Sequence, residues 1–122
     1  MRSTMNVAAA LFAGLIMAVS ARTAAADPCA GVVCNNTTVQ RLSPAADVSN
    51  PKVLVRPTDG GQQALNCTPV GGVFLTLKAS HPLFSETYAA LLEATVNNRK
   101  VSFRIVTGSP DCEIAFAVLE NP

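Results

Sequence analysis

The sequence predicts one small, mainly β domain of the α+β type that carries a single helix and is held together by disulfides. Three observations support this expectation: short alternating apolar runs bounded by Gly, Pro, Asn and Asp, one longer segment with a helical apolar repeat, and four cysteines in 122 residues. Charged residues make up 14% of the chain and hydrophobic residues 49%, a composition that excludes intrinsic disorder.

Residues 1–26 are typical of a cleaved export signal. Arg2 precedes an apolar run from Val7 to Val19, and three alanines end the segment, so we place the cleavage between Ala26 and Asp27. As a helix the apolar run spans roughly 20 Å, less than the ~30 Å of a bilayer core, so no stable membrane anchor is expected. The mature protein is expected to be exported, either periplasmic or secreted.

All four cysteines, Cys29, Cys34, Cys67 and Cys112, follow the expected cleavage site. An even number of cysteines in an exported chain indicates disulfides, and three pairings are possible. A local bridge between Cys29 and Cys34 is the simplest choice, and it leaves Cys67 to pair with Cys112. A metal site is the competing interpretation, but the cysteine spacing and a single histidine, His81, match no usual zinc motif. No metal and no cofactor is therefore expected.

Turn-forming residues dominate 27–36, where we expect irregular structure closed by the local disulfide. A single domain is expected at 37–122. Its first three strands are expected at 37–42, at 52–56, where Lys-Val-Leu-Val-Arg is short and β-branched, and at 72–78, where apolar residues alternate. Pro, Asp, Asn and Gly between these segments favour turns.

From Pro82 the apolar spacing changes to 3.6 residues, which predicts an amphipathic helix. Ser80 is the expected N-terminal cap, and Asn97 and Asn98 are expected to end the helix. The expected packing face contains Phe84, Tyr88, Leu91, Leu92 and Thr95.

Two further strands are expected at 101–106 and 112–119, separated by a Gly- and Pro-containing loop. Three strands, a helix and two strands follow the order of the OB fold, a five-stranded barrel with a helix between the third and fourth strands. We therefore expect an OB-like barrel. An open α+β sheet with the helix across one face is the alternative, because it uses the same pattern.

The segment 72–119 contains His-Pro-Leu-Phe at 81–84, Tyr-Ala-Ala-Leu-Leu-Glu-Ala at 88–94, Arg-Lys-Val at 99–101 and a cysteine before the last strand. In these features it resembles small secreted bacterial proteins of uncharacterised function. The helix and the strand after it are also similar to those in the pentameric B subunits of some AB-type bacterial toxins, which are OB-fold sugar binders. That resemblance implies the scaffold, but no glycan-binding motif of those subunits is matched here.

Residues suited to catalysis are few. His81 lies at the expected helix start, where a capping or solvent-facing role is more common than catalysis. Ser80 and Ser85 flank it without the glycines of a nucleophile elbow. Glu86 and Glu93 are seven residues apart, about 10 Å along one helix face, which is typical of a solvated face. No enzyme is therefore expected, and a small hydrolase is the least favoured function.

The charge of the chain argues against nucleic acid as a partner. Arg2 and Arg22 fall within the expected leader, so the mature part carries seven Lys and Arg against eight Asp and Glu, a formal charge of −1. Arg99, Lys100 and Arg104 gather after the expected helix, where cations interact favourably with its dipole.

These observations predict an exported, non-enzymatic module that binds a protein or glycan partner through its loops and through the face of its second and third strands. The alternative is a structural or subunit role in a larger exported assembly, including a homo-oligomer similar to the toxin B subunits. The last strand is apolar on both faces from Ile114 to Leu119, which suggests a central strand or a covered edge.

Overall fold

The computed structural model describes Ala18, Ser20 and residues 28–45, 49–58 and 60–122. The expected leader and the cleavage position between Ala26 and Asp27 lie outside the described residues, apart from Ala18 and Ser20, which belong to no helix or strand. No helix within these described ranges is both long and apolar enough to cross a membrane.

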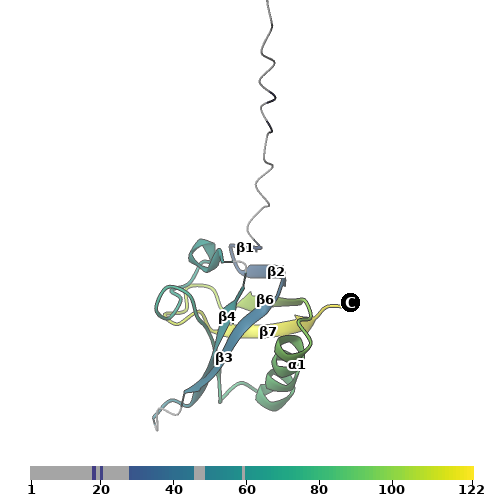
Figure 1. The fold of residues 1–122 in the computed structure, drawn as a ribbon. Coiled ribbons are helices and arrows are strands. Elements are labelled where there is room, and N and C mark those ends of the chain that lie inside the picture. Colours follow the sequence, from purple (N-terminus) through teal and green to yellow (C-terminus); the bar gives the residue numbers. More distant parts are fainter. Residues whose placement is uncertain (1–17, 19, 21–27, 46–48, 59) are drawn as a thin grey trace, which may run out of the picture.

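Two antiparallel sheets and one α-helix form the described part of the chain (Figure 1). The four-stranded sheet has the order β1 (Cys29–Ala30), β2 (Val33–Thr37), β6 (Val101–Ile105) and β7 (Ile114–Leu119). The three-stranded sheet has the order β3 (Val39–Ala45), β4 (Lys52–Pro57) and β5 (Leu75–Lys78). A short 3₁₀ turn, η1 (Gln62–Ala64), follows β4, and the helix α1 (Phe84–Val96) lies between β5 and β6.

The expected mainly β fold with one helix is confirmed, but the expectation of five strands is wrong. Seven strands occur in the described residues, partly because the expected first strand divides in two. Thr37 ends β2 in one sheet and Val39 begins β3 in the other, with only Thr38 between them. The chain therefore passes from one sheet to the other within a single extended segment.

The two sheets are not closed into a barrel, which corrects the expected OB-like closure. On the side away from Thr38, β5 and β7 meet through one parallel bridge between Thr76 and Glu113. A hydrogen bond from the Thr76 N–H to the Cys112 carbonyl, 3.0 Å long, accompanies it. β5 and β7 are not paired in either sheet, so this bridge does not close a barrel.

The N-terminal segment is more regular than expected. β1 and β2 form a hairpin in which Cys29 is opposite Cys34, and these two cysteines form the local disulfide. Gly31 lies in the turn with a φ of 61°, a left-handed conformation that glycine adopts without strain. The cross-strand bridge therefore closes a hairpin instead of an irregular loop.

The second disulfide joins Cys67 to Cys112, as the sequence favours. It ties the segment that leads into β5 to the loop between β6 and β7, with a sequence separation of 45. Gln62 of η1 is buried in the same region, and its Nε2 donates to the carbonyl oxygens of Pro57 and Val73.

Three elements begin later than expected, and one of them is β7, which starts at Ile114 and not at Cys112. β5 begins at Leu75, because Gly71 and Gly72 have φ values of 59° and 78° and form turns that interrupt an extended strand. The helix begins at Phe84 with Leu83 in the cap position and no capping side chain, so the expected Ser80 cap is wrong.

The expected end of the helix agrees with the structure. The N–H of Asn97 donates to the Glu93 carbonyl. Asn98 then adopts a φ of 51°, the left-handed conformation that follows many helix ends.

The core lies between the two sheets and beneath α1. α1 packs against β3, β5 and β7 and buries Thr87, Leu91 and Ala94, whereas Leu92 is exposed, so the expected packing face is partly wrong. Burial of each large apolar side chain contributes about 1.5–3 kcal/mol. The fully buried apolar residues of the strands are Val55, Leu75, Leu77, Val101, Phe103 and Ile114.

Candidate binding surface

The outer face of the three-stranded sheet presents a row of polar and charged side chains. Residues along β4 alternate: Val53 and Val55 are buried in the core, whereas Lys52, Leu54 and Arg56 are partly exposed on the opposite face. This is the face of the second expected strand, which the sequence identifies as a binding region.

Strand register determines which neighbours share that face. On one side Arg41 is opposite Arg56, and Ser43 is opposite Leu54. On the other side Thr76 is opposite Leu54. We call this surface the β4 face; it consists of Arg41, Ser43, Ala45, Lys52, Leu54, Arg56 and Lys78, whereas Thr76 on the same side of the sheet is fully buried.

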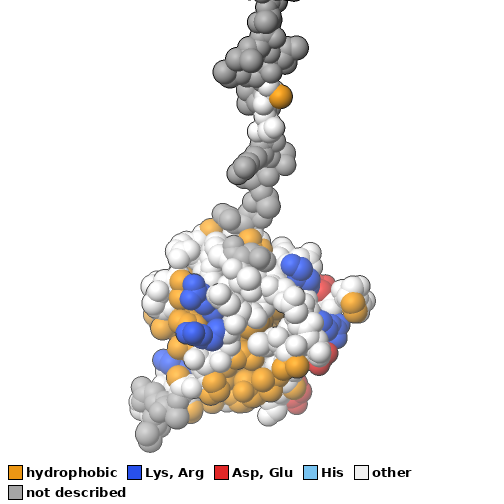
Figure 2. Space-filling view, viewed as in Figure 1, with side chains coloured by type: hydrophobic (Ala, Val, Ile, Leu, Met, Phe, Trp, Pro, Cys, Tyr) orange, Lys and Arg blue, Asp and Glu red, His pale blue; other side chains and the backbone are white. Residues whose placement is uncertain are grey.

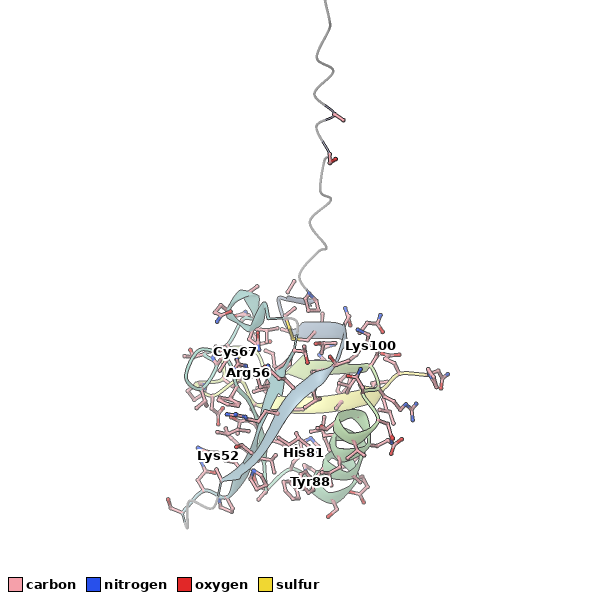
Figure 3. The ribbon with its side chains drawn as sticks, in the orientation of Figure 1. Lys52, Arg56, Cys67, His81, Tyr88 and Lys100 are labelled. Carbon is pink, nitrogen blue, oxygen red and sulfur yellow. A yellow bond between two sulfur atoms is a disulfide. The ribbon has the colours of Figure 1, made fainter. Side chains whose placement is uncertain are left out.

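Two arginines, Arg41 and Arg56, are direct cross-strand partners on the β4 face. Directly opposed residues have Cβ atoms about 4.5–5.5 Å apart, and like charges in such positions destabilise the strand pair. Among the described residues, the ion pairs involve Lys78 and Arg99 and include neither of these arginines. Blue side chains accordingly gather over β3 and β4 on the left of Figure 2, and Figure 3 labels Arg56 and Lys52 there.

The fourth cation of the face, Lys78, is neutralised. Its Nζ lies 3.1 Å from a Glu113 carboxylate oxygen and 3.8 Å from one of Asp111. The hydrogen bond to Glu113 and the charge of Asp111 raise the pKa of Lys78 above its ordinary value of 10.5. The positive charge available to a partner is therefore concentrated at Arg41, Arg56 and Lys52.

An apolar pocket of about 310 Å³ adjoins the β4 face where β3 and β4 meet the start of α1. Lys52 belongs to both the pocket and the face. The ring of Phe84 lines the pocket and stacks on Tyr88, with ring centroids 6.0 Å apart. Figure 2 shows hydrophobic side chains gathered at this lower end of the molecule. The other lining residues are Pro44, Ala45, Pro51, Val53 and Ala79.

His81, weighed above as a catalytic base, has both ring nitrogens engaged by the backbone. Its Nε2 lies 2.7 Å from the Ala115 carbonyl, and the Leu83 N–H donates to Nδ1 at 3.0 Å. With Nδ1 accepting from the Leu83 N–H, Nε2 is the ring nitrogen that donates to the Ala115 carbonyl. Neither Ser80 nor Ser85 is hydrogen-bonded to this ring, because its two nitrogens are bound elsewhere.

The other candidates from the sequence are dispersed. Arg99 binds the Glu93 carboxylate and the Glu120 carbonyl, so it fastens the end of α1 to the residues after β7. Lys100 and Arg104 are exposed, and Arg104 lies on the outer face of the four-stranded sheet opposite Phe116. The structure does not bring these three cations into one patch.

The sequence predicts a binding role for the second expected strand, but it does not reveal the Arg41–Arg56 pair. The two residues are separated by a hairpin whose register the sequence does not specify. The available signal was the alternation in Lys-Val-Leu-Val-Arg, which places both β4 cations on one face.

Comparison with family models, with curated proteins and with solved structures finds no match to this chain. Within the described residues, no three His, Cys, Asp or Glu side chains gather in a group that could hold a metal ion. The β4 face and its adjoining pocket are the features on which we base a function.

Proposed function

We propose that this protein is an exported, non-enzymatic binding module that contacts a protein or glycan partner through the β4 face. The observation that carries the proposal is the direct opposition of Arg41 and Arg56. A like-charge pair lowers the stability of the folded protein. Binding surfaces commonly keep such pairs, because a bound partner relieves the repulsion. The pocket adds a concave apolar site at the end of the same strand pair, next to Lys52 and on the side of the sheet that faces α1.

The strand arrangement supports an OB-like scaffold that is open along one side. Following neighbours from β3 through β4 and β5, the bridge at Thr76 leads to β7, then β6 and back to β2. α1 connects β5 to β6, the place of the helix in an OB fold. OB folds bind ligands on the strands that β4 and β5 correspond to, which agrees with the proposed surface.

Export is proposed from the leader and the disulfides together. Two disulfides form among the described cysteines, and such bonds persist in the periplasm or outside the cell. The apolar run and alanines before Asp27 supply the signal that would take the chain there.

Site-specific photo-crosslinking in the native cells tests the binding proposal. A photoreactive amino acid replaces Leu54 on the β4 face, Val118 on the other sheet, or the exposed Ala89 of α1 as background. We expect crosslinks to another molecule at Leu54 well above those at Ala89. Equal yields at the two positions would contradict the proposal.

The alternative, a subunit of a larger assembly, is favoured by a second surface. Phe116 and Val118 are 49% and 45% exposed on β7, the last strand of the four-stranded sheet. Exposed apolar side chains on an edge strand are typical of interfaces. Sedimentation at tens of micromolar decides: an oligomer that the Phe116→Ser, Val118→Ser double variant dissociates supports self-assembly, including a toxin-B-like ring, and a monomer contradicts it.

A further inference from the structure

We infer that the partner of the β4 face is an acidic protein segment that inserts an apolar side chain into the pocket beside Lys52. The inference rests on the proposed binding function and specifies the chemistry of the partner. It follows from the charges of the face, from the pocket, and from their shared residue.

The charges of the face set the first requirement. Arg41 and Arg56 are adjacent across the strands, and Lys52 lies four residues from Arg56 on the same face of β4, about 13 Å away at ~3.3 Å per residue. Guanidinium groups bind carboxylates through two parallel hydrogen bonds. A carboxylate between the two arginines would replace their repulsion with two favourable contacts. An acidic partner is therefore complementary to this surface.

The pocket sets the second requirement. Its lining combines Pro, Ala, Val and Phe side chains with Lys52 at its edge. Protein interfaces place apolar anchor side chains in such pockets and surround them with charged residues. Because Lys52 belongs to both features, a segment that contacts the arginines along the β4 face and passes the end of β4 at Lys52 can place an apolar side chain in the pocket.

The same features favour a protein over a polysaccharide as the partner of the β4 face. None of the seven residues of the β4 face is aromatic, so a sugar has no ring to stack on along that face; the ring of Phe84 in the pocket is already stacked on Tyr88. An extended peptide repeats its side chains on one face every second residue, as β4 does at Arg56, Leu54 and Lys52. Acidic and apolar residues that take turns at every second position therefore share one face and match the spacing of this strand.

Fluorescence anisotropy with four defined probes tests the inference on the mature, oxidised protein. The first probe is a short labelled peptide with the repeat Glu-Ser-Leu-Ser, which puts glutamate and leucine on the same face of an extended chain. In the second, glycine replaces leucine, and in the third, lysine replaces glutamate. The fourth is an oligogalacturonate with the same number of carboxylates as the first. We expect the glutamate–leucine peptide to bind roughly tenfold more tightly than each of the others, a difference of about 1.4 kcal/mol.

Matched variants assign that binding to the surface. Arg41→Gln with Arg56→Gln should weaken the glutamate–leucine peptide roughly tenfold. The control, Lys100→Gln with Arg104→Gln, removes the same charge from exposed positions elsewhere and should change affinity less than about twofold. Ala79→Leu, at an exposed position on the pocket wall, should weaken the leucine peptide and leave the glycine peptide unchanged.

The outcomes separate this inference from the proposed function. Equal losses in the two double variants, or equal affinity for the oligogalacturonate, would overturn an acidic protein partner. Crosslinking at Leu54 that persists undiminished in the Arg41→Gln, Arg56→Gln variant would retain the binding function and overturn the role of the arginines. Absence of both crosslinks and peptide binding would overturn both proposals. Circular dichroism confirms that each variant is folded.

Discussion

His81 joins the start of α1 to β7 through two hydrogen bonds to backbone groups, one from each ring nitrogen. In the sequence it is the only histidine and invites a catalytic interpretation. In the structure its partners are a carbonyl and an N–H that would otherwise lose their hydrogen bonds.

Replacing His81 should therefore lower stability. We expect His81→Ala to reduce the free energy of unfolding by about 1–3 kcal/mol, because the Ala115 carbonyl and the Leu83 N–H lose their partner. Ser80→Ala is the control and should change it by less than about 0.5 kcal/mol, because Ser80 is exposed and does not cap the helix. Urea unfolding measures both, and equal effects would refute this role for His81.

The ion pairs of Lys78 predict that the stability of the fold depends on pH in the alkaline range. Glu113 and Asp111 raise its pKa in the folded protein, so its contribution to stability is complete below pH 10.5 and is lost as the pH rises through the folded pKa. We expect Lys78→Gln to cost about 0.5–1 kcal/mol at neutral pH and to flatten the decline in stability above pH 10.5. Lys100→Gln, on an exposed side chain, should leave that decline intact; if it flattens it equally, the assignment to Lys78 fails.

At the scale of elements, the β3–β4 pair contains a cost that local propensity does not explain. Val53 and Val55 pack into the core and fix the register of β4, and this register forces Arg56 to lie opposite Arg41. A one-residue slip would relieve the repulsion but would turn the valines to solvent. The free energy gained by burying the two valines exceeds the cost of the repulsion between the arginines, so the arginines remain opposed.

The repulsion should be measurable. We expect Arg56→Gln to raise the free energy of unfolding by about 0.2–1 kcal/mol at low salt, and this gain should shrink at high salt as the charges are screened. Arg104→Gln removes the same charge from an exposed site and should give no such gain. Urea titrations at two salt concentrations compare them; a loss of stability in Arg56→Gln at low salt would show that the arginine is already compensated.

The two disulfides should contribute unequally. Cys67–Cys112 has a sequence separation of 45 and Cys29–Cys34 one of 5, for which the chain-entropy relation gives about 4 and about 2 kcal/mol. We expect Cys67→Ala with Cys112→Ala to destabilise by roughly 2–5 kcal/mol and the local pair by less. Thermal unfolding of the two double variants provides the comparison, and a larger loss for the local pair would contradict it.

At the scale of the whole molecule, the near-neutral total conceals a segregated charge. Of the seven Lys and Arg after the expected leader, Arg41, Lys52, Arg56 and Lys78 share one sheet face. Glu86 and Glu93 are exposed on α1, away from that face. The formal charge argues against nucleic acid, but it does not describe the surface that a protein partner would meet.

Mass spectrometry of the exported protein tests the assumption on which the function rests. We expect a chain that starts at Asp27 and peptides that join Cys29 to Cys34 and Cys67 to Cys112 after non-reducing digestion. Expression without residues 1–26 is the control and should leave the protein inside the cell. Free thiols or an intact leader on the native protein would refute export to an oxidising compartment.

The spacing of apolar residues and cysteines along the sequence was sufficient to predict much of the fold. The alternation at 52–56 predicted β4, the 3.6-residue spacing predicted α1, and the cysteine spacing favoured the two observed disulfides. The strand, the helix and the local disulfide depend on neighbours within a few residues, and Cys67–Cys112 is the pairing that remains once Cys29 and Cys34 are joined. The proposed binding role of the second expected strand stays a prediction.

Only the tertiary structure decided how these elements meet. The chain crosses from β2 to β3 at Thr38, and a single bridge at Thr76 connects the other side. The strands therefore form two sheets and not the expected closed barrel. The pairing of Arg41 with Arg56 and the pocket between Pro44 and Phe84 join residues far apart in the chain. Register and packing depend on the whole core, whereas local periodicity determines only which face of each element is buried.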